Sequence, residues 1–290
     1  MKLPRIDGNT KVIVLGISGR AGRQHSRIMR DYGSNIVGGV SPRADVKDVD
    51  GVPVFADAVS AVRATGATAC VALVGAMQLL DAIKDAVAAG IQLLVTPTEG
   101  MPVHDAVAAL ELTRAAGVLW IGASTPGMAV PGEAKLGFLP HDSLLPGPLG
   151  LMSKSGTLSY EAGYRLAQAG IGQSVWVGVG GDPVKGTRYA DLVPFYQEDA
   201  HTEGLLIIGE IGGHEEEEFA QALIARKFDK PVFALIAGRS APAGVTMGHA
   251  GALVHGSHGS FESKRAALNA AGVTVFASLG ELVAGVKAGL

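Results

Sequence analysis

The fold of this chain is decided by the stretch Lys11-Val12-Ile13-Val14-Leu15-Gly16-Ile17-Ser18-Gly19-Arg20-Ala21-Gly22. Its first five residues form an apolar run that is typical of a buried strand, and the glycines follow directly. A glycine-rich turn that opens a helix lets backbone N–H groups at the helix start face an anion. The stretch therefore predicts the opening of a βαβ unit, with an anion-binding turn at its centre.

Short apolar runs alternate with helix-period segments along the whole chain, a pattern typical of parallel sheets flanked by helices. In the first half, the expected strands are Lys11–Leu15, Ile36–Val40, Ala69–Val74, Gln92–Thr96 and Val118–Ile121. The expected helices there are Gly22–Tyr32, Ala76–Ala89 and Val103–Ala116. In the second half, the expected strands are Leu149–Met152, Ser174–Val179, Gly204–Ile208, Pro231–Ile236 and Val273–Phe276. The expected helices there are Leu158–Ala169, Tyr189–Asp199, Glu215–Lys227, Ser260–Ala271 and Glu281–Ala288.

A proline-rich segment separates the two halves. Because proline cannot continue a helix, we expect residues 125–149 to form an extended linker. The sequence thus predicts two doubly wound α/β domains, over residues 1–124 and 150–290. Ligands of such sheets bind beyond the carboxyl ends of the strands.

Composition limits the possible partners. The 290 residues carry a formal net charge of -3, which gives no basic field for nucleic acid. The chain shows no secretory signal and no apolar run of the ~20 residues that span a membrane, so we expect no membrane partner. The single cysteine, Cys70, lies in a predicted buried strand, where we interpret it as core. One cysteine forms no internal disulfide, and we expect a cytoplasmic location.

His249 is the main candidate for covalent chemistry. It lies between glycines in Met247-Gly248-His249-Ala250-Gly251, where a ligand has room to approach. Imidazole can carry a transferred phosphoryl group. The alternative is a loop histidine that only packs. Glu210, at a predicted strand end between glycines, could accept a hydrogen bond from one imidazole nitrogen and leave the other free to attack.

Two further segments resemble anion sites. Ser153-Lys154-Ser155-Gly156-Thr157 follows a predicted strand, and Ser155 or Thr157 could cap the next helix. In the first half, Arg43 follows the second strand in place of an acidic residue and would suit a phosphate. The acidic run Glu215–Glu218 is interpreted as a helix first turn that complements the dipole.

Two other kinds of site can be compared with the sequence. His249, His255 and His258 invite a metal site, but their spacing matches no standard zinc pattern, and we expect no metal. An NADP-dependent oxidoreductase would rest only on the first glycine loop and Arg43, and that loop reads GxxGxxG rather than GxGxxG.

Taken together, these segments resemble the α subunit of succinyl-CoA synthetase (succinate–CoA ligase) from the first strand to the last helix. The matching segments are Gly16–Gly22, Ile36–Val40, Thr98-Glu99-Gly100, Pro126-Gly127, Pro131-Gly132-Glu133, Ser155-Gly156-Thr157-Leu158, Tyr160-Glu161-Ala162, Gly180-Gly181-Asp182-Pro183, Gly209-Glu210-Ile211-Gly212-Gly213 and Met247–Ala252. The resemblance implies a Rossmann-like CoA-binding domain followed by a flavodoxin-like ligase domain. It also implies an acid–CoA ligase that works through a phosphohistidine.

The resemblance assigns roles to particular residues. It implies that His249 carries the phosphoryl group, that Glu210 orients it, and that the phosphate lies at the helix start formed by Ser153, Ser155, Gly156 and Thr157. Tyr160 matches a position near the substrate. Coenzyme A would contact the first domain, through Ser18, Gly19, Arg20, Ala21, Arg43, Thr98 and Glu99. ATP or GTP and Mg²⁺ would bind on an ATP-grasp β subunit, in an αβ or α₂β₂ assembly.

Several departures from the family bear on the substrate. Family members usually carry Pro-Asn-Cys-Pro-Gly where this chain has Ala123-Ser124-Thr125-Pro126-Gly127, and Pro97 replaces a branched aliphatic residue. The usual Gly-Lys after the second strand is Arg43-Ala44, and Val245-Thr246 stands where a basic pair is common. A ligase for another small carboxylic acid, such as malate, therefore stays open. So does a diverged CoA-binding regulatory module without turnover.

Overall fold

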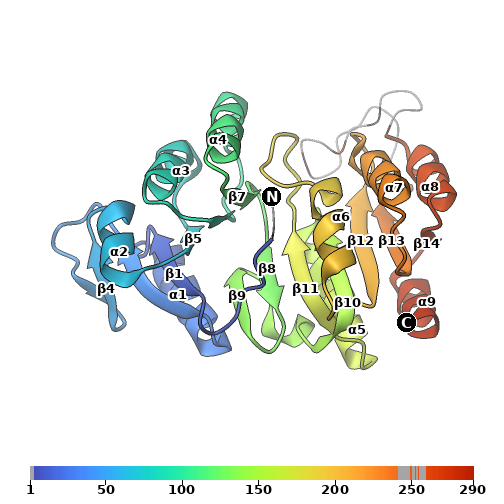
Figure 1. Cartoon of the computed structure of the whole chain (residues 1–290), viewed down its shortest axis with the longest axis horizontal. Helices are drawn as coiled ribbons and strands as arrows, with labels where there is room; N and C mark the ends of the chain where they lie inside the picture. Colours follow the sequence, from blue (N-terminus) through green and yellow to red (C-terminus); the bar gives the residue numbers. More distant parts are fainter. Residues whose placement is uncertain (1–2, 241–248, 250–251, 253, 255–258) are drawn as a thin grey trace. The chain divides into compact units, whose positions relative to one another are not determined.

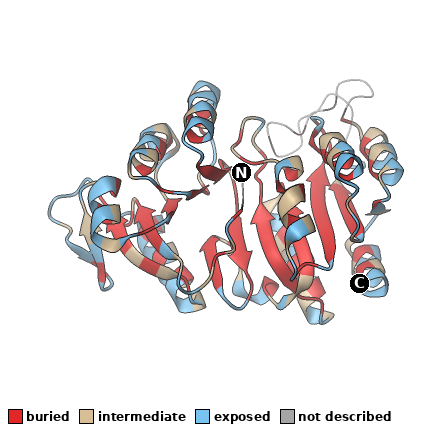
Figure 2. Ribbon diagram, in the orientation of Figure 1, coloured by how far each residue is buried: buried red, intermediate tan, exposed pale blue. Residues whose placement is uncertain are grey.

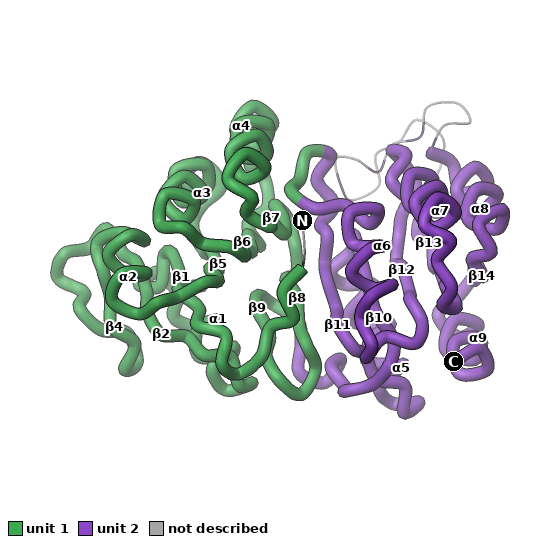
Figure 3. The backbone as a smooth tube through the Cα atoms, viewed as in Figure 1, with its two compact units in different colours: residues 1–139, 184–186 green, residues 140–183, 187–290 purple. Residues whose placement is uncertain are grey.

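The computed structural model describes residues 3–240, 249, 252, 254 and 259–290. The chain forms two compact units (Figure 3). Unit 1 comprises Met1–Leu139 and Val184–Gly186, and unit 2 comprises Pro140–Pro183 and Thr187–Leu290. Within the described residues, no helix has both the length and the apolar character needed to cross a membrane.

Unit 1 contains a seven-stranded sheet in the order β3-β4-β2-β1-β5-β6-β7. The strands are β1 (Lys11–Leu15), β2 (Asn35–Val40), β3 (Asp48–Val49), β4 (Val52–Phe55), β5 (Ala69–Ala72), β6 (Leu93–Thr96) and β7 (Leu119–Gly122). All neighbouring pairs are parallel except β3–β4. The chain leaves β1 toward β2 on one side and returns to β5 on the other, so the strand order reverses between β1 and β5. Such a switch point is where open α/β sheets bind ligands.

The helices of unit 1 cover this sheet (Figure 1). They are α1 (Arg20–Tyr32), α2 (Ala58–Thr65), the 3-10 helix η1 (Ala76–Gln78), α3 (Leu79–Ala88) and α4 (Val103–Ala115). Helices α2, α3 and α4 pack side by side, whereas α1 contacts β1, β2 and the hairpin described below. The core between the sheet and α2–α4 includes Ile13, Cys70, Leu94 and Trp120, with Ile83 from α3. Cys70 is thus core, as predicted.

The segment expected to be a linker contains regular structure. Strands β8 (Gly127–Val130) and β9 (Ala134–Gly137) pair antiparallel and form a hairpin in unit 1. Pro126 precedes β8 and Pro131 follows it, so these prolines mark strand ends, where a missing N–H costs no ladder hydrogen bond. The expectation of an extended linker over residues 125–149 is therefore corrected to a hairpin, the 3-10 helix η2 (His141–Ser143) and the start of β10.

Unit 2 is a second doubly wound sheet in which β14-β13-β12-β10-β11 follow one another and pair in parallel. Its strands are β10 (Pro146–Ser153), β11 (Gln173–Gly178), β12 (Gly204–Glu210), β13 (Val232–Ala237) and β14 (Thr274–Phe276). Its helices are α5 (Gly156–Gln168), α6 (Tyr189–Glu198), α7 (Glu215–Arg226), α8 (Phe261–Ala270) and α9 (Leu279–Gly289). Helices α6, α7 and α8 pack in a row, and α5 packs on α9.

The central strands are buried in both units (Figure 2). Strands β5 and β6 of unit 1 and β11 and β12 of unit 2 are buried along their whole length. Continuous burial is characteristic of parallel strands covered on both faces, and it produces the apolar runs from which the strands were predicted. The predicted α/β fold, with an N-terminal and a second doubly wound sheet, is confirmed.

Candidate active site

The side chains of His249 and Glu210 form a hydrogen bond in unit 2. The imidazole Nδ1–H donates to Glu210 Oε2 across 2.7 Å. Glu210 is the last residue of β12 and is buried, whereas His249 is partly exposed. This hydrogen bond to the carboxylate favours the tautomer with the proton on Nδ1, in which Nε2 carries the lone pair. The hydrogen bond predicted between these two residues is present.

The loop after β11 makes room for His249. A Cβ atom built on Gly181 would lie 2.5 Å from His249 Nδ1 and 2.6 Å from its Cγ. Real Cβ atoms do not approach other atoms so closely, so any other residue at position 181 would push the imidazole away. The absence of a side chain at Gly181 therefore leaves the space that the imidazole occupies.

The start of α5 is capped as predicted. Ser155 is the N-cap residue, and its hydroxyl accepts a hydrogen bond from the N–H of Leu158. Ser153 lies at the end of β10, and its Oγ donates to the carbonyl of Ser155 (2.7 Å) and accepts from the N–H of Ser155 (3.0 Å). Gly156 and Thr157 are the first two residues of the helix, where N–H groups have no intrahelical partner.

Tyr160 lies one turn further along α5. Its carbonyl accepts a hydrogen bond from Ser143 Oγ at 2.8 Å. Burial raises the pKa of its phenol to about 12, so the hydroxyl keeps its proton at neutral pH. The phenol of Tyr160 can therefore donate a hydrogen bond, but it cannot act as a base at neutral pH.

Strand register brings these loops to one edge of the sheet. Ser153 pairs with Gly178 of β11 on one side and with Ile208 of β12 on the other. The strands are parallel, so the residues after each strand end emerge at the same edge. The capped start of α5, the Gly181 loop and Glu210 all lie at this carboxyl edge, which is the expected place for a ligand.

A buried ionic cluster near this edge was not predicted from the sequence. Lys154 Nζ lies 2.9 Å from Glu216 Oε1 and 3.5 Å from Glu215 Oε2. Lys264 of α8 binds Glu216 Oε2 from the other side. Burial alone would raise the pKa of Glu216, but Lys154 and Lys264 lower it to about 2. The acidic run does form the first turn of α7, as predicted, yet two of its carboxylates are buried partners of lysines.

In unit 1, the glycine-rich turn joins β1 to α1. Gly19 is the N-cap residue of α1 and brings no side chain, so no N-cap side chain binds the first N–H groups, at Arg20 and Ala21. A Cβ atom at Gly22 would lie 2.1 Å from the Gly16 carbonyl oxygen, so the tight turn requires glycine. Ser18 Oγ lies 2.7 Å from Ser41 Oγ, which joins this turn to the loop after β2.

The other predicted unit 1 residues follow two further strands of the same sheet, β6 and β2. Thr98, after β6, donates from Oγ1 to the carbonyl of Val74, after β5, at 2.7 Å. Glu99 is exposed beside it. Arg43 is also exposed, and its guanidinium lies 3.0 Å from the carboxylate of Asp45. A phosphate bound by Arg43 would have to compete with this surface ion pair, which is weak because it is solvated.

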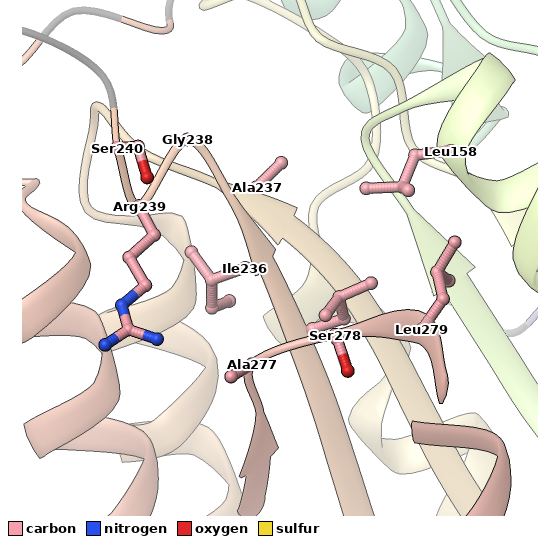
Figure 4. A pocket seen from close by; sticks show the side chains of 10 residues that line it. Leu158, Ile236, Ala237, Gly238, Arg239, Ser240, Ala277, Ser278 and Leu279 are labelled. Atoms are coloured by element: carbon pink, nitrogen blue, oxygen red, sulfur yellow. The ribbon is translucent and has the colours of Figure 1, made fainter. Parts of the chain in front are cut away.

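A separate pocket of about 480 Å³ lies beside the end of β13. Leu158 of α5 and Leu279 of α9 line one side, and Arg239 lies on the other (Figure 4). Its lining, among the residues that the structure describes, includes neither Glu210 nor His249. The candidate active site therefore rests on the hydrogen-bonded pair and not on this largely apolar pocket.

The sequence predicts no metal site at the loop histidines His249, His255 and His258. Within the described part of the chain, no group of three or more His, Cys, Asp or Glu side chains could hold a metal ion. His255 and His258 lie outside the described residues, as do Val245 and Thr246. The absence of a metal at these loop histidines stays a prediction.

Two family models match the chain. The CoA binding domain matches residues 7–100, and the CoA-ligase domain matches residues 152–274. The chain is 44% identical to the succinate–CoA ligase [ADP-forming] α subunit of Aquifex aeolicus, over 96% of this chain and 93% of the relative. It is 43% identical to α subunit 1 of the same enzyme from Archaeoglobus fulgidus, over 97% and 96%.

The chain belongs to the succinate–CoA ligase α-subunit family. It is thus a CoA ligase subunit with an N-terminal CoA-binding domain. Among solved structures, ATP citrate lyase from Methanothrix soehngenii, in complex with citrate and coenzyme A, has the same fold with a TM-score of 0.88 and 24% identity. The match covers 97% of this chain but 50% of that chain. The acetyl-coenzyme A synthetase 1 of Ca. Korarchaeum cryptofilum gives a TM-score of 0.79 at 22% identity, over 97% and 60%.

The two family matches enclose the predicted site residues of this succinate–CoA ligase α-subunit relative. Ser18 through Glu99 fall within the CoA binding domain, and Ser153 through His249 fall within the CoA-ligase domain. The residues predicted for coenzyme A lie in unit 1, and those predicted for the phosphohistidine lie in unit 2.

Proposed function

We propose that this chain is the α subunit of an ADP-forming succinate–CoA ligase and that His249 carries the phosphoryl group. The hydrogen bond from His249 Nδ1 to Glu210 Oε2 is the observation that carries this proposal. It fixes the tautomer in which Nε2 holds a lone pair, as nucleophilic imidazole requires. The names of the relatives, which are ADP-forming α subunits, support ATP as the phosphoryl donor.

The reaction would proceed in three transfers. The Nε2 lone pair attacks the γ-phosphorus of ATP, so that an N–P bond forms, the P–O bond breaks and ADP leaves. A carboxylate oxygen of the acid then attacks this phosphorus, which frees Nε2 and gives an acyl phosphate. Finally the thiol sulfur of coenzyme A attacks the acyl carbon, phosphate leaves with its electron pair, and the thiol proton passes to solvent.

Glu210 would act throughout the first two transfers. When Nε2 is phosphorylated, the imidazole becomes a cation that keeps its proton on Nδ1. The Glu210 carboxylate, 2.7 Å away and largely buried, stabilises this cation and holds the ring orientation. When the phosphoryl group leaves, the same hydrogen bond returns the ring to its starting tautomer.

The start of α5 would hold the transferred phosphate. Its uncapped N–H groups lie at the same sheet edge as Glu210, and the helix dipole favours an anion there. The nearest cation in sequence, Lys154, is held by Glu215 and Glu216. We therefore assign phosphate binding to backbone N–H groups with Ser155, Gly156 and Thr157, and not to a lysine.

Unit 1 would bind coenzyme A at its switch point. The residues fit this ligand because Gly19 leaves the N-terminus of α1 open, and an open helix start receives phosphate. Ser18 follows β1 and Thr98 follows β6, so both lie at the carboxyl edge of the same sheet. The match of residues 7–100 to a CoA binding domain supports the assignment. ATP and Mg²⁺ would bind on an ATP-grasp β subunit. The relatives' designation as α subunits supports the existence of a β partner.

The identity of the acid follows from the relatives' names and not from a described contact. We propose succinate, with malate as the alternative acid to be compared directly. Similarity to ligase α subunits over nearly the whole chain does not favour a regulatory module without turnover.

The test is a turnover assay of the chain with its β subunit, which measures ADP release with CoA, ATP, Mg²⁺ and either acid. The proposal predicts release that depends on both succinate and CoA. Higher kcat/KM with malate would reassign the substrate. A preparation that binds CoA but releases no ADP with either acid would contradict the ligase function.

A further inference from the structure

Glu216 lies at the centre of the buried cluster and has no exposed side-chain surface. One oxygen, Oε1, accepts a hydrogen bond from Lys154 Nζ at 2.9 Å, and Oε2 accepts from Lys264 Nζ. Oε1 also accepts a hydrogen bond from the backbone N–H of Glu210 at 3.2 Å. Glu216 therefore holds the main chain of the residue whose side chain binds His249.

The close approach of Glu216 to this strand end depends on Gly209. A Cβ atom at position 209 would lie 2.4 Å from Glu216 Oε1 and 2.9 Å from its Cγ. Any larger residue would displace the carboxylate from the N–H of Glu210. Gly209 and Glu216 thus form a matched pair in which one leaves the space that the other fills.

Lys154 connects the same carboxylate to the start of α5. Its ammonium binds Glu216, and its backbone N–H donates to the carbonyl of Ile208 at 3.1 Å. The next residue, Ser155, is the N-cap of α5. One buried carboxylate therefore ties together the proposed phosphate-binding helix start and the strand end that orients the imidazole.

Lys264 fixes the opposite oxygen. It comes from α8 and is fully buried, and its Nζ also donates to the carbonyl of Gly213 at 3.2 Å. With both oxygens bound by ammonium groups, the carboxylate cannot rotate without breaking a buried ion pair. Such fully satisfied polar networks hold one arrangement of side chains.

We propose that Glu216 is a positioning residue for the phosphohistidine reaction, which sets the place of Glu210 and, through it, the tautomer and orientation of His249. The effect on phosphoryl transfer rests on the proposed function. The effect on the imidazole does not, because it follows from hydrogen bonds within unit 2.

The test compares Glu216→Gln with Glu217→Gln in the full chain. Glu217 is a matched control because it lies next on α7 and its Oε2 lies 3.3 Å from the same Lys264 Nζ. Its other oxygen accepts from Ser263 Oγ at 3.0 Å. The first readout is the tautomer of His249, from ¹⁵N chemical shifts of the imidazole. The second is the rate of His249 phosphorylation with the β subunit and ATP.

In the wild type and in Glu217→Gln, we expect the neutral imidazole to carry its proton on Nδ1. In Glu216→Gln, we expect a substantial share of the Nε2–H form and phosphorylation slowed by roughly 10-fold to 100-fold, with unchanged KM for CoA. A wild-type tautomer in folded Glu216→Gln overturns the inference. A wild type that is never phosphorylated overturns the proposed function instead.

A second variant covers the case in which Glu216→Gln does not fold. Gly209→Ala keeps every charge of the cluster, and its methyl group would displace the side chain of Glu216. We expect it to show the same shift of tautomer as Glu216→Gln. A folded Gly209→Ala protein with the wild-type tautomer overturns the inference.

Discussion

His249 occupies the space that a side chain at position 181 would take. Its Nδ1 lies 2.5 Å from the place of a Cβ atom on Gly181. We expect Gly181→Ala to displace the imidazole from Glu210 and to slow phosphohistidine formation by roughly 10-fold to 100-fold, because small misplacements of a nucleophile are costly. The measurement is single-turnover labelling with γ-labelled ATP and the β subunit.

Gly280→Ala is a suitable control for this variant. Gly280 lies in α9, and a Cβ atom there would meet only Ser278 Oγ, at 4.0 Å. Labelling should match the wild type in this control. Equal labelling in Gly181→Ala would show that the imidazole does not need the space that glycine leaves.

The lowered pKa of Glu216 predicts how the free energy of unfolding depends on pH in the acidic range. Its pKa falls from 4.5 to about 2 in the folded chain. Because the unfolded chain takes up this proton first, the stabilisation is complete above about pH 4.5 and is lost as the pH falls toward 2. Above pH 4.5, this shift in pKa contributes about 3 kcal/mol to the free energy of unfolding.

Urea unfolding at several pH values checks this prediction. The difference in unfolding free energy between the wild type and Glu216→Gln should shrink as the pH falls from 5 toward 2. A difference that stays constant over this range would mean that Glu216 has the same pKa in both states.

The lowered pKa of Lys135 predicts that the free energy of unfolding depends on pH in the alkaline range. This residue of β9 is buried and donates from Nζ to the carbonyl of Leu139 at 2.6 Å. Burial lowers its pKa from 10.5 to about 8. Between these values the unfolded chain holds a proton that the folded chain has released, so this group makes the protein more stable as pH rises.

We expect Lys135→Met to remove this rise between pH 8 and 10.5, as followed by urea unfolding. Exposed Lys84, which pairs with Asp81 on α3, provides the control variant Lys84→Met. If Lys135→Met retains the whole alkaline rise, another group is responsible for it.

Because Arg43 and Asp45 form an ion pair, we expect their replacement by alanine to have opposite effects on CoA binding. Their side chains are exposed and 3.0 Å apart. If Arg43 binds the ribose phosphate of CoA, Arg43→Ala should weaken binding by roughly 10-fold, which is the scale of a charge-assisted hydrogen bond. Asp45→Ala should tighten binding by freeing the guanidinium.

Calorimetric titration with CoA and with dephospho-CoA, which lacks that phosphate, separates the possibilities. Arg43→Ala should affect only CoA. An equal loss for both ligands, or none, would remove Arg43 from the phosphate site.

Much of the fold could be predicted because parallel strands are buried on both faces and read as apolar runs. Strand β1 has the predicted bounds, and β12 begins where predicted. Helix α2 was missed because it is only eight residues long, although Asp57 caps its start and Gly66 its end. The hairpin was missed because its prolines lie at strand ends, where they resemble those of a linker.

Part of the candidate site could also be predicted, from signals in the local sequence. Glu210 and Ser155 stand at a strand end and a helix start, positions that local sequence marks. The burial of Glu216 could not be predicted, since an acidic first turn is ordinarily solvated. It depends on Lys154 and Lys264, which only the folded sheet and α8 bring to the carboxylate.

The most direct test of the account is the position of the phosphoryl group. The chain and its β subunit would be incubated with γ-labelled ATP and Mg²⁺, and the acid-labile label mapped in the wild type and in His249→Ala. We expect label on His249 alone, discharged by succinate and CoA together, and an unlabelled variant that still binds CoA. Label that persists in His249→Ala, or a wild type that turns over without any label, would contradict the account.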